Sequence, residues 1–299
     1  MGRVLVVGSA NTDMVVQVPH LPRPGETVLG GTFAQVPGGK GANQAVAAAR
    51  LDAEVTLIAC VGKDALGDAA VKDWKRLGID TSHIQCTDHA PTGVALITVD
   101  ASGENSIAVA SGANHYLRPS HLTRSAFAEA DVVLLQLEVP LDTVARALEL
   151  ARAEGCRIIL NPAPAQPLPS SLLHQVDVLT PNQHEFEHVS GREGLDNAAS
   201  WRSEKMIPHL IVTCGAQGAL WFHEHGMQSV AAHAATAIDT TGAGDVFNGA
   251  LAAQWAKGVP MAIALAWANA AAGFAVTQPG AQPDRLNVGQ VSHMINAAP

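Results

Sequence analysis

Residues 239–249 (DTTGAGDVFNG) combine two glycines with a carboxylate just before an alanine-rich helical pattern. Gly242 and Gly244 allow successive backbone N–H groups to point into one concavity, at the positive end of a helix that begins near Asp245. Such a nest suits an oxyanion or a phosphoryl group in transfer, and Asp245 could take a proton from a hydroxyl nucleophile. A glycine-rich turn with Asp245 as N-cap explains the same residues, so both interpretations stay open for this segment alone.

A second glycine-rich segment, residues 37–51 (PGGKGANQAVAAARL), also opens a helical pattern. Its glycines let a substrate approach the backbone, and it presents Lys40 and Asn43, although the segment alone is more typical of a tight helix start than of a site. Neither segment is a common nucleotide motif. Gly41 stands where a Walker A loop needs Ser or Thr, and Phe247 stands where the dinucleotide motif needs its third glycine.

Residues 8–13 (GSANTD) follow a short apolar run that is typical of a strand. Asn11 and Asp13 are two apart in this extended stretch, so their side chains project to the same side. An amide and a carboxylate placed in this way could bind a pair of sugar hydroxyls. An Asx-turn is the alternative use of the same residues.

Residues 184–188 spell H-E-x-x-H, the zinc-binding half of a metalloprotease. A metzincin needs a third histidine where this chain has Gly194, and Pro181 predicts that the helix starts near Asn182, with His184 in its first turn. A later glutamate such as Glu204 stays open as a third zinc ligand. We expect surface or packing roles for His184 and His188, and a turn between strands for His223 and His225.

The chain has 299 residues, of which 47% are hydrophobic, and a formal net charge of −9. This charge, without any basic run, argues against a nucleic-acid surface, so a bound phosphate must rely on backbone N–H groups, helix N-termini, metal ions and a few cations. Four separated cysteines indicate reduced thiols. The longest apolar stretch falls short of the roughly 20 residues that a membrane span needs. We expect a cytoplasmic protein without a membrane or nucleic-acid partner.

Short β-branched runs alternate with alanine-rich amphipathic segments along the chain. This alternation predicts one α/β domain over residues 1–299, with a doubly wound, mostly parallel sheet covered by helices on both faces. Ligands are then expected at the carboxyl ends of the strands. Residues 13–38 and 92–111 instead alternate apolar with polar side chains, which predicts insertions that form a small antiparallel β lid.

Taken together and in order, these motifs resemble the ribokinase family of carbohydrate kinases, also called the phosphofructokinase-B family. The resemblance covers essentially the whole chain and includes the family's G-G signature at Gly38 and Gly39 and its D-T-x-G-A-G-D signature, which ends at Asp245. Within the family, GSANTD, PGETV, GGKGANQAVAAA, NPAPA and GAQP are most similar to the members that phosphorylate ribose.

The resemblance implies roles for individual residues. Asp245 would be the catalytic base, with the backbone of Gly242, Ala243 and Gly244 as anion hole. The sugar would be surrounded by Asn11, Asp13, Gly39, Lys40, Asn43 and Glu138. ATP would be bound by Asn182, Thr213, Gly215, Gly218, Gly244 and Asn269. Glu185 would organise Mg²⁺ through water, and K⁺ would be bound by Asp239, Thr241, Ala275, Gln278, Gly280 and Asp284.

The implied activity is ATP-dependent phosphorylation of D-ribose at its 5-hydroxyl, with Mg²⁺ and K⁺ as cofactors and a homodimer formed through the lid. A kinase for deoxyribose, another sugar or a nucleoside is the alternative within the family. A non-catalytic regulator that binds a sugar or nucleotide, and a zinc hydrolase, are more distant alternatives.

Overall fold

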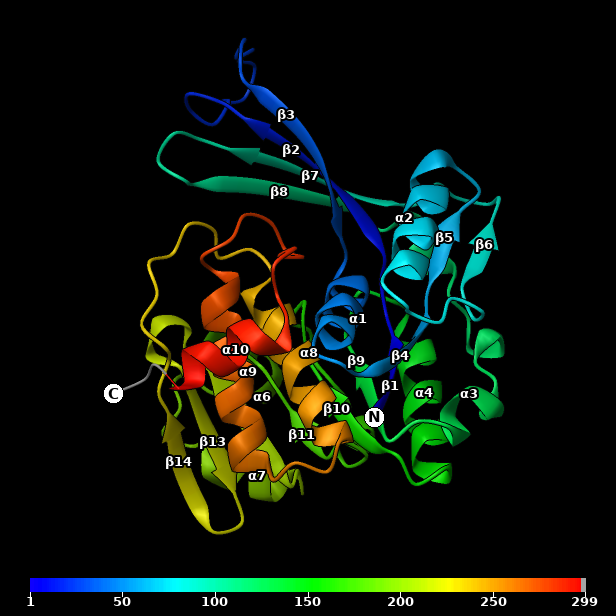
Figure 1. The fold of residues 1–299 in the computed structure, drawn as a ribbon, viewed down its shortest axis with the longest axis vertical. Helices are drawn as coiled ribbons and strands as arrows, with labels where there is room; N and C mark the ends of the chain where they lie inside the picture. Colours follow the sequence, from blue (N-terminus) through cyan, green and yellow to red (C-terminus); the bar gives the residue numbers. More distant parts are fainter. Residues whose placement is uncertain (297–299) are drawn as a thin grey trace.

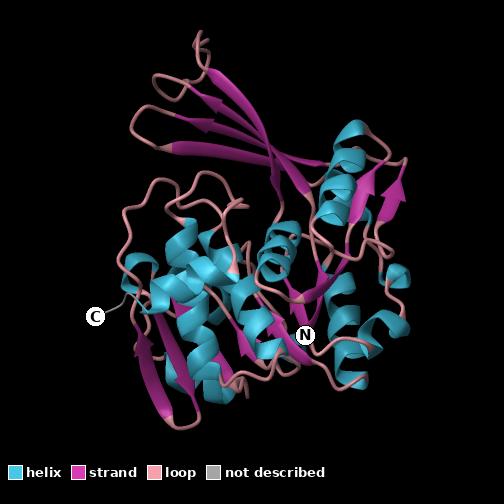
Figure 2. Ribbon diagram, viewed as in Figure 1, coloured by secondary structure: helices cyan, strands magenta, loops and turns pink. Residues whose placement is uncertain are grey.

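Eight strands form the main sheet of the computed structural model, which describes residues 1–296 (Figures 1 and 2). In spatial order they are β14 (Gly226–Val230), β13 (Ala219–His223), β12 (His209–Thr213), β11 (Val178–Leu179), β10 (Arg157–Leu160), β9 (Val132–Leu135), β1 (Arg3–Val7) and β4 (Glu54–Ile58). The strands from β12 to β4 are parallel, and β13 and β14 extend the sheet as an antiparallel hairpin. The chain continues from β1 to β4 on one side and later to β9 on the other, and such a reversal of strand order favours a ligand site.

Side chains of the central strands alternate between two hydrophobic cores. Val4 and Val6 of β1 join one core, whereas Leu5 and Val7 join the other. Both faces of these parallel strands are covered, which explains why they are apolar at nearly every position.

Helices cover both faces of the main sheet (Figure 2). The core that contains Val6 is completed by α1 (Lys40–Arg50), α2 (Ala65–Arg76), α8 (Ala243–Ala256), α9 (Met261–Ala275) and α10 (Val288–Asn296). The core that contains Leu5 is completed by η1 (Gly112–Tyr116), α3 (Arg124–Ala128), α4 (Leu141–Ala153), α5 (Ser170–Leu173), α6 (Gln183–Ser190) and α7 (Ala198–Glu204). Two further 3-10 turns are η2 (Pro119–His121) and η3 (Gly215–Gln217). The prediction of a doubly wound, mostly parallel sheet is confirmed. No helix among residues 1–296 has the length and apolar character that crossing a bilayer requires.

The lid is a second sheet of β3 (Thr32–Gly38), β2 (Asn11–Gln17), β7 (Gly93–Val99) and β8 (Asn105–Ala110), which projects from the main body (Figure 1). The two outer pairs are antiparallel hairpins, as predicted, whereas the central pair β2–β7 is parallel. Both hairpins leave the main body in the same direction, since Asn11 pairs with Gly93 at the root of the lid. Several apolar lid side chains are exposed, among them Phe33 (63%) and Leu96 (58%).

The apolar run at residues 54–62, which predicts one strand, divides at Ala59 into β4 and β5 (Cys60–Gly62). β5 pairs with β6 (Gln85–Thr87) in a separate two-stranded sheet beside α2. Only β4 belongs to the main sheet.

Candidate active site

The carboxyl ends of β1 and β9 bring two predicted sugar-binding segments together. Val7 and Leu135 are register partners at the ends of these neighbouring parallel strands, so the residues that follow them leave the sheet at one edge. Glu138 then joins the segments: its Oε2 accepts from Ser9 Oγ at 2.5 Å and from the backbone N of Lys40 at 2.9 Å. The carboxylate therefore lies at the positive N-terminus of α1, where a negative charge is stabilised.

Glycines at the start of α1 allow close approach to the end of β1. Gly39, the N-cap, has φ of 87°, and a Cβ there would lie 2.6 Å from the backbone N of Asn11. A Cβ on Gly38 would overlap the carboxylate of Asp13. The two glycines thus make room for the residues that are predicted to bind the sugar.

Asp245 lies in the first turn of α8, which begins at Ala243, two residues before the predicted start. Its Oδ2 accepts from Asn43 Nδ2 at 3.0 Å and its Oδ1 accepts from Gln44 Nε2 at 2.9 Å. Burial raises the pKa of Asp245, and the nearby Lys40 ammonium together with the two amide donors opposes this rise. A buried carboxylate with a raised pKa is suited to accept a proton.

The predicted anion hole has the geometry of a helix N-terminus. Gly242 is the N-cap in the left-handed region, with φ of 71°, so the alternative of Asp245 as N-cap is wrong. The N–H groups of Gly244 and Asp245 have no acceptor within the helix because they belong to its first turn. A Cβ on Gly242 would overlap Ala281, which shows how closely Ala281 packs against this glycine. This arrangement suits an anion in front of the helix.

Four carboxylates from different parts of the chain act on the charge of Lys40. Burial opposes its charge, but the influence of Asp245, Glu138, Glu185 and Asp13 is larger and raises its pKa. Burial and the neighbouring carboxylates Glu138 and Asp245 raise the pKa of Asp13 to about 6. The four carboxylates outnumber the single cation, Lys40, so the cluster has a net negative charge. This charge favours a cation or a hydroxyl donor as its ligand.

A cavity of about 410 Å³ adjoins Asn11 and Glu138. Val109 of β8 and Leu137 contribute apolar wall, and Asn114 of η1 contributes an amide. Asn114 Nδ2 donates to Asn11 Oδ1 at 2.7 Å, and its Oδ1 accepts from the backbone N of Ala10 at 2.8 Å. The amide of Asn114 therefore fixes the side chain of Asn11.

Four of the residues predicted to bind the nucleotide lie at or beyond the ends of β11 and β12: Asn182, Thr213, Gly215 and Gly218. The backbone N of Thr213 donates to Pro181 O at 2.9 Å, which places the turn at residues 213–218 beside Asn182. Gly215 and Gly218 have positive φ, of 56° and 89°. Asn269 of α9 donates to Val230 O at 2.8 Å, and Val230 O is the atom that a Cβ on Gly218 would overlap. The structure thus brings these segments into one neighbourhood.

Asn182 and Glu185 form a capping box at the start of α6. Asn182 Oδ1 accepts from the backbone N of Glu185, and Glu185 Oε2 accepts from the backbone N of Asn182, both at 2.8 Å. Burial raises the pKa of Glu185, although the bond from Asn182 and the charge of Lys40 oppose the rise. One carboxylate oxygen of Glu185 is thus committed to the cap, and Oε1 is the oxygen suited to a magnesium-bound water. Mg²⁺ usually keeps several waters and takes substrate phosphates as ligands, so a single carboxylate fits it.

His184 and His188 are exposed on α6, with ring centroids 4.5 Å apart. Within residues 1–296, no three His, Cys, Asp or Glu side chains are grouped so that they could hold a metal ion. His223 ends β13 and His225 lies in the following turn, where a turn between strands is predicted.

The segments predicted to bind K⁺ are joined to each other. Asp239 accepts from the backbone N of Thr241 at 2.9 Å and from that of Gly280 at 2.8 Å. Burial would raise the pKa of Asp239, but these bonds outweigh it and lower the pKa. Ala275 O already accepts from the backbone N of Gln278 at 2.9 Å.

Asp284 stands apart from this group in its contacts. Its side chain is 95% exposed and pairs with Arg50 at 2.9 Å, while Arg50 also donates to the carbonyls of Gln282 and Pro283. Arg50 therefore connects the end of α1 to the loop before α10.

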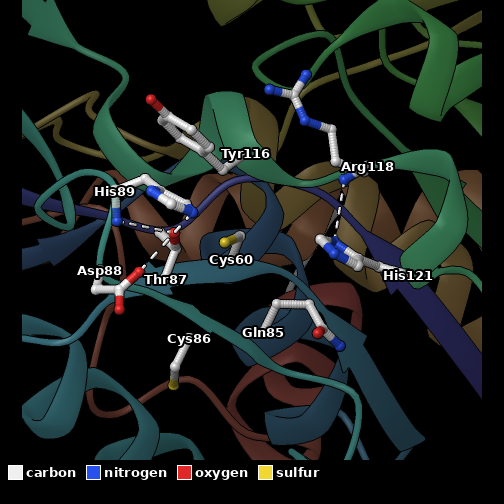
Figure 3. A pocket seen from close by; sticks show the side chains of 9 residues that line it. All are labelled: Cys60, Gln85, Cys86, Thr87, Asp88, His89, Tyr116, Arg118 and His121. Atoms are coloured by element: carbon white, nitrogen blue, oxygen red, sulfur yellow. Dashed lines mark hydrogen bonds and ion pairs between the residues drawn. The ribbon is translucent and has the colours of Figure 1, made fainter.

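A second cavity, of about 470 Å³, contains none of the predicted site residues (Figure 3). It is lined by Cys60, Gln85, Cys86, Thr87, Asp88, His89, Tyr116, Arg118 and His121. Tyr116 stacks on His89 with centroids 5.7 Å apart, and the Arg118 guanidinium lies 5.4 Å from the Tyr116 ring centre. Burial, with a smaller contribution from Cys86, raises the pKa of Cys60 to about 11, so this thiol is a poor nucleophile at neutral pH.

The comparison with known proteins agrees with the motif resemblance. The family model of pfkB family carbohydrate kinases matches residues 1–287. The chain belongs to this family. A ribokinase of Haemophilus influenzae is 41% identical to this carbohydrate kinase over 284 residues, which cover 93% of each chain. A deoxyribokinase of Salmonella typhi is 34% identical over 301 residues, or 98% of each chain. A solved structure of Arabidopsis thaliana ribokinase complexed with ribose and ATP is 28% identical, with a TM-score of 0.92 and 99% of each chain covered.

Four polar residues of the kinase site carry no prediction from the motifs: Ser9, Gln44, Asn114 and Gln282. Each bonds to a predicted site residue or to its partner, as Gln282 Nε2 does to Asn43 Oδ1 at 2.9 Å. Ser9 and Gln44 stand inside the quoted motifs, where an uncharged polar residue next to glycine or alanine was a usable signal. Gln282 also stands inside a quoted motif, GAQP, whereas Asn114 lies in η1 outside the quoted motifs. Only the folded arrangement shows the hydrogen-bond partners of these two residues.

Proposed function

We propose that the protein transfers the γ-phosphoryl group of ATP to the 5-hydroxyl of D-ribose. The observation that carries this proposal is the position of Asp245. Its buried carboxylate accepts hydrogen bonds from Asn43 and Gln44 of the glycine-rich segment 37–51, and it lies in the first turn of α8, where the backbone N–H groups point out of the helix end. A base beside an anion nest is what transfer to a hydroxyl requires. The ribokinase of Haemophilus influenzae and the Arabidopsis ribokinase complex with ribose and ATP support ribose as the acceptor.

In the proposed reaction, Asp245 takes the proton of the 5-hydroxyl. The hydroxyl oxygen forms a bond to the γ-phosphorus while the bond from that phosphorus to the β–γ bridging oxygen breaks, which yields D-ribose 5-phosphate and ADP. The backbone N–H groups of Gly242, Ala243 and Gly244 are proposed to stabilise the charge on the transferring group. Preorganised donors of this kind are worth roughly 10²–10³ in rate each in other enzymes.

The sugar is proposed to lie between the end of β1, the start of α1 and the end of β9. Its contacts would be Asn11, Asp13, Gly39, Lys40, Asn43 and Glu138. Hydrogen bonds support this grouping, since Glu138 joins Ser9 to Lys40 and Asn43 reaches Asp245. Carboxylates and amides that converge in this way can bind adjacent hydroxyls as acceptors and donors.

ATP is proposed to bind along Asn182, Thr213, Gly215, Gly218, Gly244 and Asn269. When bound, Mg²⁺ neutralises charge on the phosphates of the nucleotide. Glu185 would hold its hydration shell through Oε1, and Asn182 would face the phosphates. K⁺ would be held by Asp239, Thr241, Ala275, Gln278 and Gly280. Asp284, whose Oδ1 pairs with Arg50, is the remaining member of the proposed set.

Deoxyribose is the second candidate acceptor, because the Salmonella typhi deoxyribokinase is also similar over nearly the whole chain. A coupled ADP-release assay over ribose, deoxyribose, fructose and nucleosides, each with and without K⁺, separates the candidates. We expect the highest kcat/KM for ribose and stimulation by K⁺. Clear turnover of another acceptor without turnover of ribose would overturn the substrate assignment. The reaction also requires cellular ATP, which is consistent with the proposed cytoplasmic location.

A further inference from the structure

Asp245 is held by two amides that differ in what else they contact. Asn43 Nδ2 donates to Oδ2, and Asn43 is one of the proposed sugar contacts. Gln44 Nε2 donates to Oδ1, but Gln44 is 0% exposed and is not among the proposed sugar contacts. The two helices that carry these groups, α1 and α8, pack against each other (Figure 1).

The amide of Gln44 is fully committed to buried partners. Nε2 donates its second hydrogen to Asn161 Oδ1 at 3.1 Å, and Oε1 accepts from Gln136 Nε2 at 2.6 Å. Gln136 and Asn161 directly follow β9 and β10, and Asn161 donates in turn to Thr180 O at 2.9 Å. An ionised carboxylate only accepts hydrogen bonds, so Asp245 requires the nitrogen of Gln44 on its side and the oxygen toward Gln136. The ends of the main sheet thereby hold Gln44 in one orientation.

We propose that Gln44 is a positioning residue, which holds Oδ1 of Asp245 during turnover and leaves Oδ2 as the oxygen that receives the proton. This inference rests on the proposed function in one respect, namely that Asp245 is the base. Asn43 is a proposed sugar contact, so its amide nitrogen is shared between Oδ2 of Asp245 and the sugar. No such sharing exists at Oδ1, because Gln44 is buried and both of its Nε2 hydrogens are already donated.

A pH profile separates this role from a merely structural one. The charged groups that face Asp245 are Lys40 of α1, Glu138 after β9, Asp13 of β2 and Glu185 of α6. Burial raises the pKa of Asp245, and donation from Gln44 opposes the rise. Loss of this donor alone should raise the pKa further, so the acidic limb of kcat/KM should move to higher pH.

The first test is Gln44→Met, which keeps the length of the side chain and removes both donors. We expect kcat to fall about 10- to 100-fold, because a misplaced base costs rate. KM for ribose and ATP should stay within about threefold, since no substrate contact is removed. Gln254→Met is the matched control: Gln254 is also a buried helical glutamine, in α8, and it has no hydrogen bond to Asp245. Its kcat and pH profile should match the parent protein.

A folded Gln44→Met protein with kcat within twofold of the parent would overturn the proposal. So would a loss confined to the KM for the sugar, or a fall in kcat with an unmoved acidic limb. If Gln44→Met does not fold, Gln136→Met removes the donor that orients Gln44, and an unchanged kcat there overturns the proposal as well. Asp245→Asn in the same series tests the proposed function separately. Turnover in that variant would contradict the assignment of Asp245 as the base, whereas an unchanged kcat in Gln44→Met alone would contradict only the role of Gln44.

Discussion

At the scale of single residues, the site depends on carboxylates that are kept in places where charge is unfavourable. Asp245 is buried and has a raised pKa, and Asp13 has a pKa of about 6. The chain tolerates these groups because Lys40 and several amides lie beside them. The residues that are expected to bind the substrates are therefore also sites of unfavourable free energy in the unliganded fold.

The sharpest test of the proposed base is Asp245→Asn. The side chain keeps its size but cannot accept the hydroxyl proton, so we expect turnover to fall at least about 10²-fold, the lower bound for general base catalysis. The melting temperature should change little, because the removal of a buried charge offsets the loss of one of the two hydrogen-bond acceptors that Asn43 and Gln44 use. Steady-state ADP release and thermal unfolding measure the two effects. Near-parental turnover would exclude Asp245 as base.

Asp13→Asn should stabilise the protein at the expense of sugar binding. The pKa of Asp13 is about 6 in the folded protein, against 3.8 for an unperturbed aspartate. The folded state therefore binds the proton more tightly and loses stability as pH rises from about 4 to 6. At pH 8 the variant should gain at most about 3 kcal/mol in free energy of unfolding, and this gain should shrink by about half at pH 5. Denaturant unfolding at both pH values measures it, with Asp196→Asn at an exposed position as control. A gain that does not depend on pH would contradict the assigned cause.

At the scale of elements, the N-termini of three helices position the predicted site residues. α1 begins after Gly39, α6 begins at the Asn182 cap and α8 begins after Gly242, and all three starts carry predicted site residues. These helix starts could be predicted from the sequence, because their signals are local. Glycine favours a positive φ, and Asn followed three residues later by Glu is typical of a capping box. The strands were readable from their apolar runs.

Contacts between distant segments were not readable from the sequence. Asp284 was expected among cation ligands, but no local pattern shows that Arg50, 234 residues away, pairs with it. The same holds for the separate β5–β6 sheet and for the parallel pairing of β2 with β7, both of which depend on the direction in which distant strands meet.

Gly242→Ala tests the helix start that forms the anion nest. The new Cβ would overlap Ala281 and would force a left-handed φ on alanine, so we expect kcat to fall about tenfold or more as the N–H groups shift. Gly258→Ala, at the other end of α8, has a similar φ of 78° but no atom within 4 Å of the added Cβ. Both variants should lose about 1 kcal/mol or more of stability from backbone strain, and only Gly242→Ala should lose rate. Equal rates in the two variants would contradict a role for the nest.

At the scale of the whole molecule, the exposed apolar side chains of the lid need a partner, and we propose that a second copy of the chain supplies it. Phe33 and Leu96 lie on the same face of the lid sheet, as their register with β2 shows, and both are more than half exposed. An exposed apolar patch on a small sheet marks a contact surface.

The double variant Phe33→Lys, Leu96→Lys should therefore convert a dimer into monomers, because buried lysines in an apolar contact would be strongly unfavourable. Light scattering after size-exclusion chromatography measures the mass. Met227→Lys on β14 is an equally exposed substitution outside the lid and should leave the mass unchanged. A parent protein that is monomeric at micromolar concentration would contradict the proposed dimer.

The lid and the sugar site share residues, because β2 begins at Asn11 and continues through Asp13. No linker separates them, and Asn11 is also the register partner of Gly38 and Gly93. A tilt of the whole of β2 would therefore displace Asn11 and Asp13. Water competes with the sugar hydroxyl as acceptor of the phosphoryl group. A lid built into the strand that is proposed to bind the sugar would work against that wasteful hydrolysis, since the proposed sugar contacts and the lid share β2.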